Sequence, residues 1–269
     1  MKHTSLHSHP FAALLCRMSY TICVLLLSSL SLVLSAQSVN RKHTIRTQGK
    51  SRAQTATKKA LSTTSSGATG ISVATAGAID LGLSVLWAAT NVGANSPEQF
   101  GDFFAWGETT PKTNYTWDTY RWCAGASDDL KKYNCESGYG TVDNKAVLDL
   151  EDDAAHAKLG GVWRMPTSVE MDELKEKCHW MHMAYRGVQG YKVTGPNGNS
   201  IFLPATGYRS ETAHGSRGTS GYYWSSTLIT SYPEKAFYLF CGASNTAKYN
   251  NDRSIGCTVR PVCSPNKTR

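Results

Sequence analysis

The segment whose side chains are best suited to binding a ligand lies at residues 115–122. It reads Tyr-Thr-Trp-Asp-Thr-Tyr-Arg-Trp, with four aromatic residues and one arginine. Flat rings with hydrogen-bonding rims suit the faces of sugars and peptides, so we expect the four rings to form a partly exposed recognition surface. They are Tyr115, Trp117, Tyr120 and Trp122. The alternative, which the general burial of large rings favours, is that they pack into the domain beneath a long loop.

Two clusters contain metal-binding residue types, and we expect neither to hold a metal. Cys178, His179 and His182 would share one face of a helix, but no further ligand stands at a fixed spacing, and Cys178 is better used in a disulfide. Four carboxylates offer the oxygen ligands that calcium prefers, although acids also suit the start of a helix, which is the interpretation we favour. They are Asp149, Glu151, Asp152 and Asp153.

The common catalytic motifs are missing from the sequence. Gly-x-Ser-x-Gly, His-Glu-x-x-His and phosphate-loop patterns are absent, and the glycine-rich run at residues 215–221 lacks the lysine of a phosphate loop. We therefore expect no catalytic residue and no cofactor.

Six of the eight cysteines lie in the part of the chain predicted to fold and are candidates for disulfides. Cys16 and Cys23 lie near the N-terminus, and the closest pair in the remainder, Cys257 and Cys263, does not have the spacing of a zinc site. An even number of cysteines in a secretory context favours disulfides, and we expect at least two, with the pairing left open. The candidates are Cys123, Cys135, Cys178, Cys241, Cys257 and Cys263.

The net charge of +8 comes from the N-terminal part of the chain. Residues 1–79 contain nine Lys or Arg and no acid, so the remaining residues have a net charge of −1. Binding a phosphate backbone requires basic groups clustered on a folded surface. We therefore expect no nucleic-acid partner.

The N-terminal residues are expected to direct export. Residues 20–34 form an apolar run that follows Lys2 and Arg17 and precedes the small residue Ala36, as in a signal peptide cleaved near that residue. The run is shorter than the roughly 20 residues of a membrane span, so we expect no transmembrane span in the mature chain. An uncleaved anchor is the alternative, and Met18 is an alternative start. The mature protein is expected to be secreted or held at the cell surface.

Composition divides the chain into four parts. Residues 1–36 are the expected signal peptide. Residues 37–78 contain no aromatic or acidic residue and many Ser, Thr, Lys and Arg, which is typical of a disordered linker. Residues 79–264 have the content of a folded domain, and residues 265–269 form a tail.

The domain is predicted to combine two helices with antiparallel strands. Residues 151–159 form the first predicted helix, and the second begins at Thr167, with Glu170 completing a capping box. Asn197-Gly198 predicts a β-hairpin over residues 190–203. Further strands are predicted at residues 80–92, 102–106, 222–228, 236–241 and 255–262. This composition indicates the α+β class.

A series of ordered motifs carries a family resemblance. They are Asp80-Leu-Gly-Leu, Trp87-Ala, Asn91-Val-Gly-Ala, Gly101-Asp, Ala105-Trp-Gly-Glu-Thr, Gly161-Val-Trp-Arg-Met-Pro-Thr, Phe202-Leu-Pro-Ala-Thr-Gly-Tyr-Arg, Tyr223-Trp-Ser-Ser-Thr and Val259-Arg-Pro-Val-Cys. In these motifs residues 79–263 resemble the Fibrobacter succinogenes major paralogous domain family. The resemblance implies a C-type lectin-like fold, with two helices, short antiparallel sheets and long loops, on a secreted or surface protein of Bacteroidetes or their relatives.

The resemblance adds three candidate binding residues and excludes one kind of site. Lectin-like folds usually bind at the loop before Tyr222, where Arg209, His214 and Arg217 lie. The calcium-type sugar-binding motifs Glu-Pro-Asn, Gln-Pro-Asp and Trp-Asn-Asp are absent, so calcium-dependent sugar binding is not expected.

These observations predict a non-enzymatic binding module that recognises a glycan or a cell-surface protein. One alternative is a structural or adhesive subunit of a surface assembly. Another is an enzyme, because formylglycine-generating enzymes share the lectin-like fold and a fold alone does not exclude catalysis.

Overall fold

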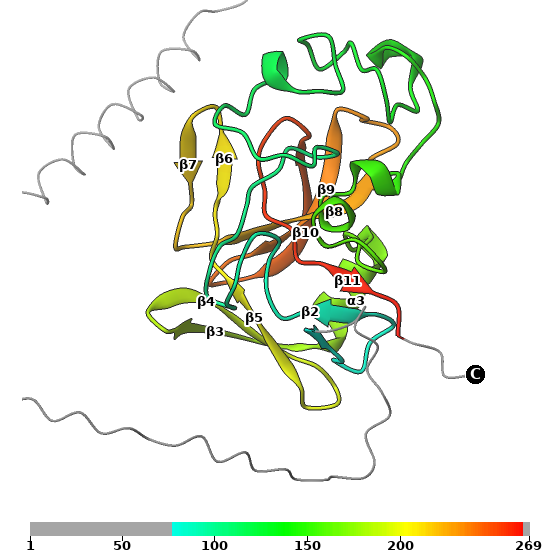
Figure 1. Ribbon diagram of the computed structural model, residues 1–269. Coiled ribbons are helices and arrows are strands. Elements are labelled where there is room, and N and C mark those ends of the chain that lie inside the picture. Colours follow the sequence, from blue (N-terminus) through cyan, green and yellow to red (C-terminus); the bar gives the residue numbers. More distant parts are fainter. Residues whose placement is uncertain (1–76, 266–269) are drawn as a thin grey trace, which may run out of the picture. The chain divides into compact units, whose positions relative to one another are not determined.

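The computed structural model describes residues 77–265 (Figure 1). The predicted signal peptide at 1–36, nearly all of the predicted linker at 37–78, Cys16, Cys23 and most of the predicted tail lie outside this range. Within it, two α-helices and eleven short strands are present, and the strands form four antiparallel sheets. The predicted α+β class is confirmed, and small sheets dominate it.

A three-stranded sheet of order β10-β9-β8 runs through the middle of the domain (Figure 1). Its strands are β8 (Gly221–Leu228), β9 (Lys235–Cys241) and β10 (Thr246–Asp252). Trp224 and Tyr238 pack into one buried cluster, whereas Tyr223 and Leu239 pack into another. Because alternate side chains of a strand point to opposite faces, β8 and β9 are covered on both sides and were predictable as apolar runs. The polar edge strand β10 was not predicted.

A second sheet, of order β3-β4-β5, follows the longer helix. Its strands are β3 (His179–Tyr185), β4 (Val188–Thr194) and β5 (Ser200–Pro204). The predicted hairpin is confirmed, with Val193 opposite Ile201 and Gly198 in its turn at φ +87°. The helix α3 (Ser168–Lys177) begins after Thr167, which forms the predicted capping box with Glu170.

The residues that follow α3 form a strand instead of continuing the helix. Cys178 has an extended backbone, and β3 starts at His179. In a strand, side chains three positions apart point to opposite faces, so His179 and His182 diverge. The expectation that Cys178, His179 and His182 share a helical face is therefore wrong.

The third sheet, of order β1-β2-β11, joins the two ends of the domain. Its strands are β1 (Ala78–Ile79), β2 (Leu86–Ala88) and β11 (Val262–Cys263). Most of the predicted strand at residues 80–92 consists of bends and turns. Phe104 and Cys257 form an isolated bridge where longer strands were predicted at 102–106 and 255–262.

The helix α2 (Ala154–Leu159) is shorter than predicted. Leu150–Asp152 form a 3₁₀ turn ahead of it, and the side chain of Asp153 caps the helix by accepting the backbone N–H groups of Ala155 and His156. Further 3₁₀ turns lie at Trp117–Thr119 and Ser137–Tyr139. None of the helices between residues 77 and 265 has the length and apolar character of a membrane span.

A buried arginine ties the long loops to the end of β10. Arg253 is 0% exposed and donates from Nε to the hydroxyl of Tyr120 at 2.8 Å. Its other guanidinium hydrogens reach the carbonyl oxygens of Lys132, Tyr133 and Pro233. Because these acceptors come from separate loops, one side chain holds the loops together and satisfies its own charge without an acid.

Arg260 plays the same part between β2 and β5. It is 1% exposed, and it donates to Asn91 Oδ1 and to the carbonyl oxygens of Ala88, Ala89 and Phe202. Burial lowers the pKa of Arg260 to about 10, and the group stays charged at neutral pH.

The six cysteines of the described residues are free, so the structure forms none of the predicted disulfides. The buried thiols lie in four different apolar clusters, where they pack as small apolar side chains. These are Cys123, Cys241, Cys257 and Cys263. Placement in separate clusters keeps the thiols apart, which sequence counting does not reveal.

Candidate functional site

Two of the four rings at residues 115–122 belong to the core. Tyr115 and Tyr120 are each 3% exposed, and their hydroxyls donate to the carbonyl oxygens of Phe103 and Trp106, both at 2.7 Å. The expectation that they form part of an exposed recognition surface is therefore wrong. Their hydrogen bonds explain how phenol groups are buried without loss, because each hydroxyl finds an acceptor.

The other two rings, those of Trp117 and Trp122, are half-buried, and each has different neighbours. Trp117 packs edge-on against Tyr120, with ring centroids 5.4 Å apart. Trp122 donates from Nε1 to the carbonyl of Gly107 at 2.7 Å, and the cations of Arg121 and Lys132 lie 4.5 and 5.2 Å from its ring. Two of the four rings are therefore buried, and the ring of Trp122 is already in contact with two cations. The predicted recognition surface of four rings is not formed.

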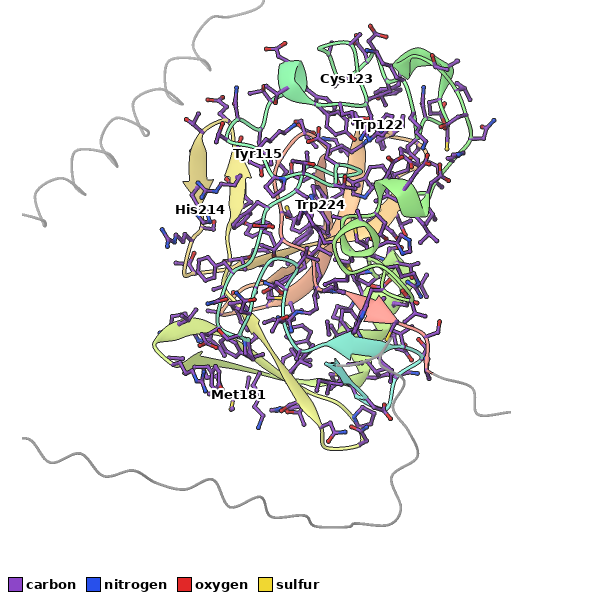
Figure 2. The ribbon with its side chains drawn as sticks, in the orientation of Figure 1. Tyr115, Trp122, Cys123, Met181, His214 and Trp224 are labelled. Atoms are coloured by element: carbon purple, nitrogen blue, oxygen red, sulfur yellow. The ribbon has the colours of Figure 1, made fainter. Side chains whose placement is uncertain are left out.

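The three basic residues before Tyr222 do come together. They lie on or beside a hairpin of β6 (Tyr208–Ser210) and β7 (Ala213–Gly215), in which Arg209 pairs with His214. The guanidinium of Arg209 lies 5.3 Å from the ring of Phe103, and that of Arg217 lies 5.6 Å from the ring of Phe100. We call these five residues the arginine cluster. Figure 2 shows His214 on this hairpin.

His214 packs against an aromatic ring of the arginine cluster. Its ring is edge-on to that of Phe103, with centroids 5.0 Å apart. Burial lowers the pKa of His214, the hydrogen bond to the carbonyl of Thr206 opposes this shift, and the charges of Arg209 and Arg217 add to the lowering. Nε2 lies 2.7 Å from the carbonyl oxygen of Thr206, so Nε2 donates this hydrogen bond.

Two hollows open beside the arginine cluster. One, of 530 Å³, includes Arg209 and Tyr115 in its walls, and the other, of 490 Å³, includes Arg217. They share Gly101 and Asp102, and both volumes fall in the roughly 300–1,000 Å³ typical of ligand pockets. The arginine cluster and the two hollows together are the candidate functional site.

Backbone pairing brings the aromatic segment to this site. Tyr115 and Glu211 exchange two hydrogen bonds of 2.9 Å, which fix residues 115–122 beside the β6–β7 hairpin. The two segments were separate predictions from the sequence. Phe100, Phe103 and Asp102 were not predicted as site residues, although Asp102 follows Gly101 in one of the family motifs and Phe103 lies in the strand predicted at 102–106.

The two arginines of the site have no acidic partner. None of the ion pairs between residues 77 and 265 involves Arg209 or Arg217. Lys112, in the wall of the first hollow, is by contrast paired with Glu108 at 2.9 Å. A guanidinium that packs on a ring keeps its N–H groups for acceptors, so both arginines can bind carboxylate, sulfate or hydroxyl oxygens of a ligand.

The acidic run at residues 149–153 does not contribute to this site. Oxygens of Asp149, Glu151 and Asp152 lie within 4.8 Å of one another, and Lys132 Nζ contacts them at 2.8, 3.1 and 2.6 Å. Burial opposes the charge of Lys132, but these hydrogen bonds outweigh it and raise its pKa above the ordinary value. Two ammonium groups, those of Lys132 and Lys145, thus lie against these carboxylates, while Asp153 alone caps α2, which begins three residues after the predicted helix start.

Comparison with known proteins assigns no activity to this arrangement. A family model described as a domain of unknown function (DUF8237) matches residues 160–262. The matched part contains the β6–β7 hairpin with its three basic residues, but not Phe100 or Phe103. No curated protein and no solved structure matches the chain.

Proposed function

We propose that the chain is a secreted or surface-exposed, non-enzymatic binding module with a C-type lectin-like fold, similar to the Fibrobacter succinogenes major paralogous domain family. Its ligand is a glycan or a cell-surface protein, bound at the arginine cluster. The observation that carries the proposal is the pair Arg209 and Arg217, which lack acidic partners and stack on rings at the edges of two hollows.

The geometry suits recognition of an oxygen-rich ligand. The guanidinium groups of Arg209 and Arg217 lie 5.3 and 5.6 Å from the rings of Phe103 and Phe100, and such cation–π contacts favour these positions of the two side chains. Asp102, in the walls of both hollows, offers carboxylate oxygens as acceptors beside the two guanidinium donors. Two guanidinium donors and a carboxylate acceptor beside aromatic rings are groups that a sugar or a polar peptide loop can satisfy.

The cysteines support binding over cysteine chemistry of the kind used by formylglycine-generating enzymes. Burial raises the pKa of the thiols of Cys241 and Cys257 far above the ordinary value, so both are protonated at neutral pH. A catalytic thiol needs the opposite shift and solvent access. The partly exposed thiols of Cys135 and Cys178 also have raised pKa values.

A glycan array combined with capture of surface proteins tests the proposal. The mature chain should retain a defined set of glycans or one surface protein, and Arg209→Ala and Arg217→Ala should each weaken binding about tenfold or more. Lys158→Ala, which changes an exposed cation on α2, is the matched control and should bind as the wild type does.

Three outcomes would contradict the proposed function. Turnover of a substrate without stable retention would indicate an enzyme. Binding that is lost in neither arginine variant would move the site away from the arginine cluster, and assembly with copies or subunits alone would favour the structural or adhesive alternative.

A further inference from the structure

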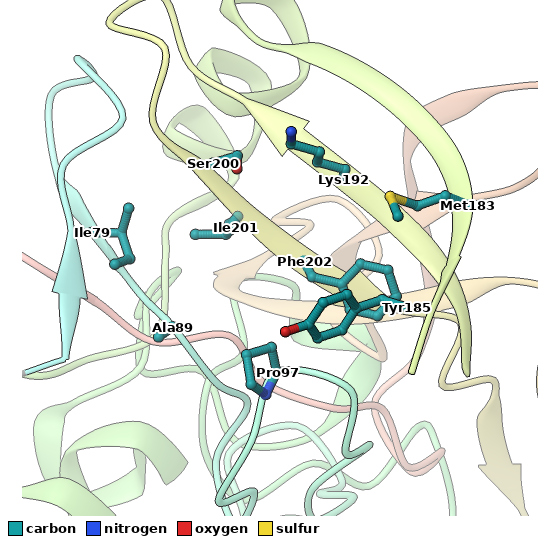
Figure 3. Close-up of a pocket in the computed structure, with 9 residues that line it drawn as sticks. All are labelled: Ile79, Ala89, Pro97, Met183, Tyr185, Lys192, Ser200, Ile201 and Phe202. Carbon is teal, nitrogen blue, oxygen red and sulfur yellow. The ribbon is translucent and has the colours of Figure 1, made fainter. Parts of the chain in front are cut away.

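A separate pocket lies on the β3-β4-β5 sheet. It has a volume of 420 Å³, and its lining residues come from three parts of the chain (Figure 3). The sheet contributes Met183, Tyr185 and Phe202, and the facing wall consists of Ile79, Ala89 and Pro97. None of these residues belongs to the candidate functional site, so the pocket needs an explanation of its own.

The apolar wall of this pocket contains two rings in contact. The centroids of Tyr185 and Phe202 are 5.3 Å apart, with ring planes inclined by 46°. In Figure 3 the hydroxyl end of Tyr185 points toward Pro97, and the ring of Phe202 lies next to the ring of Tyr185. A flat apolar group between rings and a proline gains contact on both of its faces, because aromatic surfaces favour stacked and tilted neighbours.

One end of the pocket is polar. Lys192 and Ser200 lie together at the end farther from Pro97 in Figure 3. Lys192 is exposed, and it takes part in none of the ion pairs formed by the described residues. Its neighbours across the strands are Met181 and Phe202, which offer no acid. An anionic group of a ligand at this end of the pocket could therefore form an ion pair with Lys192.

The size of the feature favours a small molecule over a protein. Among the large apolar side chains of β3, β4 and β5, only Met181 is strongly exposed, at 44%. A protein interface generally buries at least about 1,000 Å² and needs a broader apolar patch. A pocket of 420 Å³ instead falls in the range of roughly 300–1,000 Å³ that small ligands occupy.

We infer that this pocket binds a small aryl carboxylate, with the ring between Pro97 and the Tyr185–Phe202 pair and the carboxylate at Lys192 and Ser200. The apolar walls supply the binding of the ring, and the ammonium with the neighbouring hydroxyl sets the orientation. This pocket shares no lining residue with the two hollows at the arginine cluster.

Titration calorimetry of the mature chain with 2-naphthoate tests the inference, with 2-naphthylmethanol as the uncharged match. We expect a Kd of roughly 0.1–1 mM for the naphthoate. Lys192→Met should weaken naphthoate about three- to fivefold, as for an exposed ion pair, and leave naphthylmethanol unchanged. Ala89→Leu, which fills the pocket, should weaken both ligands by about tenfold or more.

Ala184→Leu is the matched control, because Ala184 is an exposed alanine of β3 that does not line the pocket. It should bind both ligands as the wild type does. If Ala89→Leu does not fold, the position of naphthoate is tested in the wild-type protein by nuclear Overhauser effects between naphthoate and the methyl group of Met183. Absence of naphthoate binding in the millimolar range, equal binding to Lys192→Met, or missing contacts to Met183 would overturn the inference.

Discussion

At the scale of single residues, Arg253 connects the loops that surround the aromatic segment. Its guanidinium is buried with four acceptors and no carboxylate, and it also packs against Trp106, with its centre 4.9 Å from the ring. A buried cation is tolerated only when all of its hydrogen bonds are made, so the loops and the arginine depend on each other.

Arg253→Met should therefore destabilise the domain strongly. The substitution leaves the Tyr120 hydroxyl and the three carbonyl oxygens with lost partners, and we expect a decrease of about 3 kcal/mol or more in the free energy of unfolding. Urea denaturation followed by tryptophan fluorescence measures the change. Arg121→Met, at an exposed position, is the control and should change stability little. Equal stability of the two variants would contradict this account of Arg253.

The thiols give a second prediction at this scale. Labelling of the unreduced, denatured protein should find six reactive thiols in the domain.

In the native protein, burial, followed by the charge of Glu173, raises the pKa of Cys178 to about 11. Alkylation of Cys178, followed by peptide mass spectrometry, should therefore keep accelerating from pH 9 to pH 11. A rate of alkylation that stops rising near pH 9 would contradict the raised pKa of Cys178. Fewer than six reactive thiols would contradict the absence of disulfides among the described residues.

The sign of the linked stability change follows from the same shift. The pKa of Cys178 is higher in the folded than in the unfolded state, so the unfolded chain releases its proton first. Stability should therefore be unaffected by this group below pH 9 and decrease as pH rises from 9 to 11.

At the scale of elements, Lys132 and the 3₁₀ turn before α2 form a unit. The ammonium lies among three carboxylates, where oxygen-rich clusters in other proteins hold calcium. Removing this cation leaves Glu151 and Asp152 without their ammonium partner, while Asp149 keeps Lys145 at 2.6 Å, so the cluster becomes more acidic and better suited to a divalent ion.

Lys132→Ala should thus lower the melting temperature and make it sensitive to calcium. With calcium at about ten- to a hundredfold excess over its Kd, the melting temperature of the variant should rise by roughly 3–10 °C. The wild type and the exposed-site control Lys158→Ala should not respond. An equal response in all three proteins, or none in Lys132→Ala, would show that Lys132 does not stand in for a cation.

At the scale of the whole molecule, the expected export of the chain still rests on its first 36 residues. An apolar run of signal-peptide length followed by Ala36 predicts that the exported protein begins near Gln37. N-terminal sequencing of protein recovered outside the cytoplasm checks this. Recovery of the intact leader would favour the uncleaved anchor, and recovery inside the cell alone would remove the basis for a surface function.

The elements that sequence analysis located correctly depend on neighbours in the chain. The capping box of Thr167 and Glu170 and the turn at Asn197-Gly198 each need only a few adjacent residues, so their signals are complete in the sequence. β3 was missed because the residues after Lys177 become a strand only by pairing with β4.

The candidate site was decided by tertiary structure. From the sequence, the family resemblance identified Arg209, His214 and Arg217, but Phe100 and Phe103, more than a hundred positions earlier, meet them only after folding. The same holds for Tyr115 and Tyr120, whose burial depends on acceptors in other loops, and for the cysteines, which separate into different clusters. Backbone preferences depend on short stretches of sequence, so the sequence alone determined the fold class and the turns. Burial, charge pairing and cavity shape arise from contacts between distant residues, so only the folded chain determined the site.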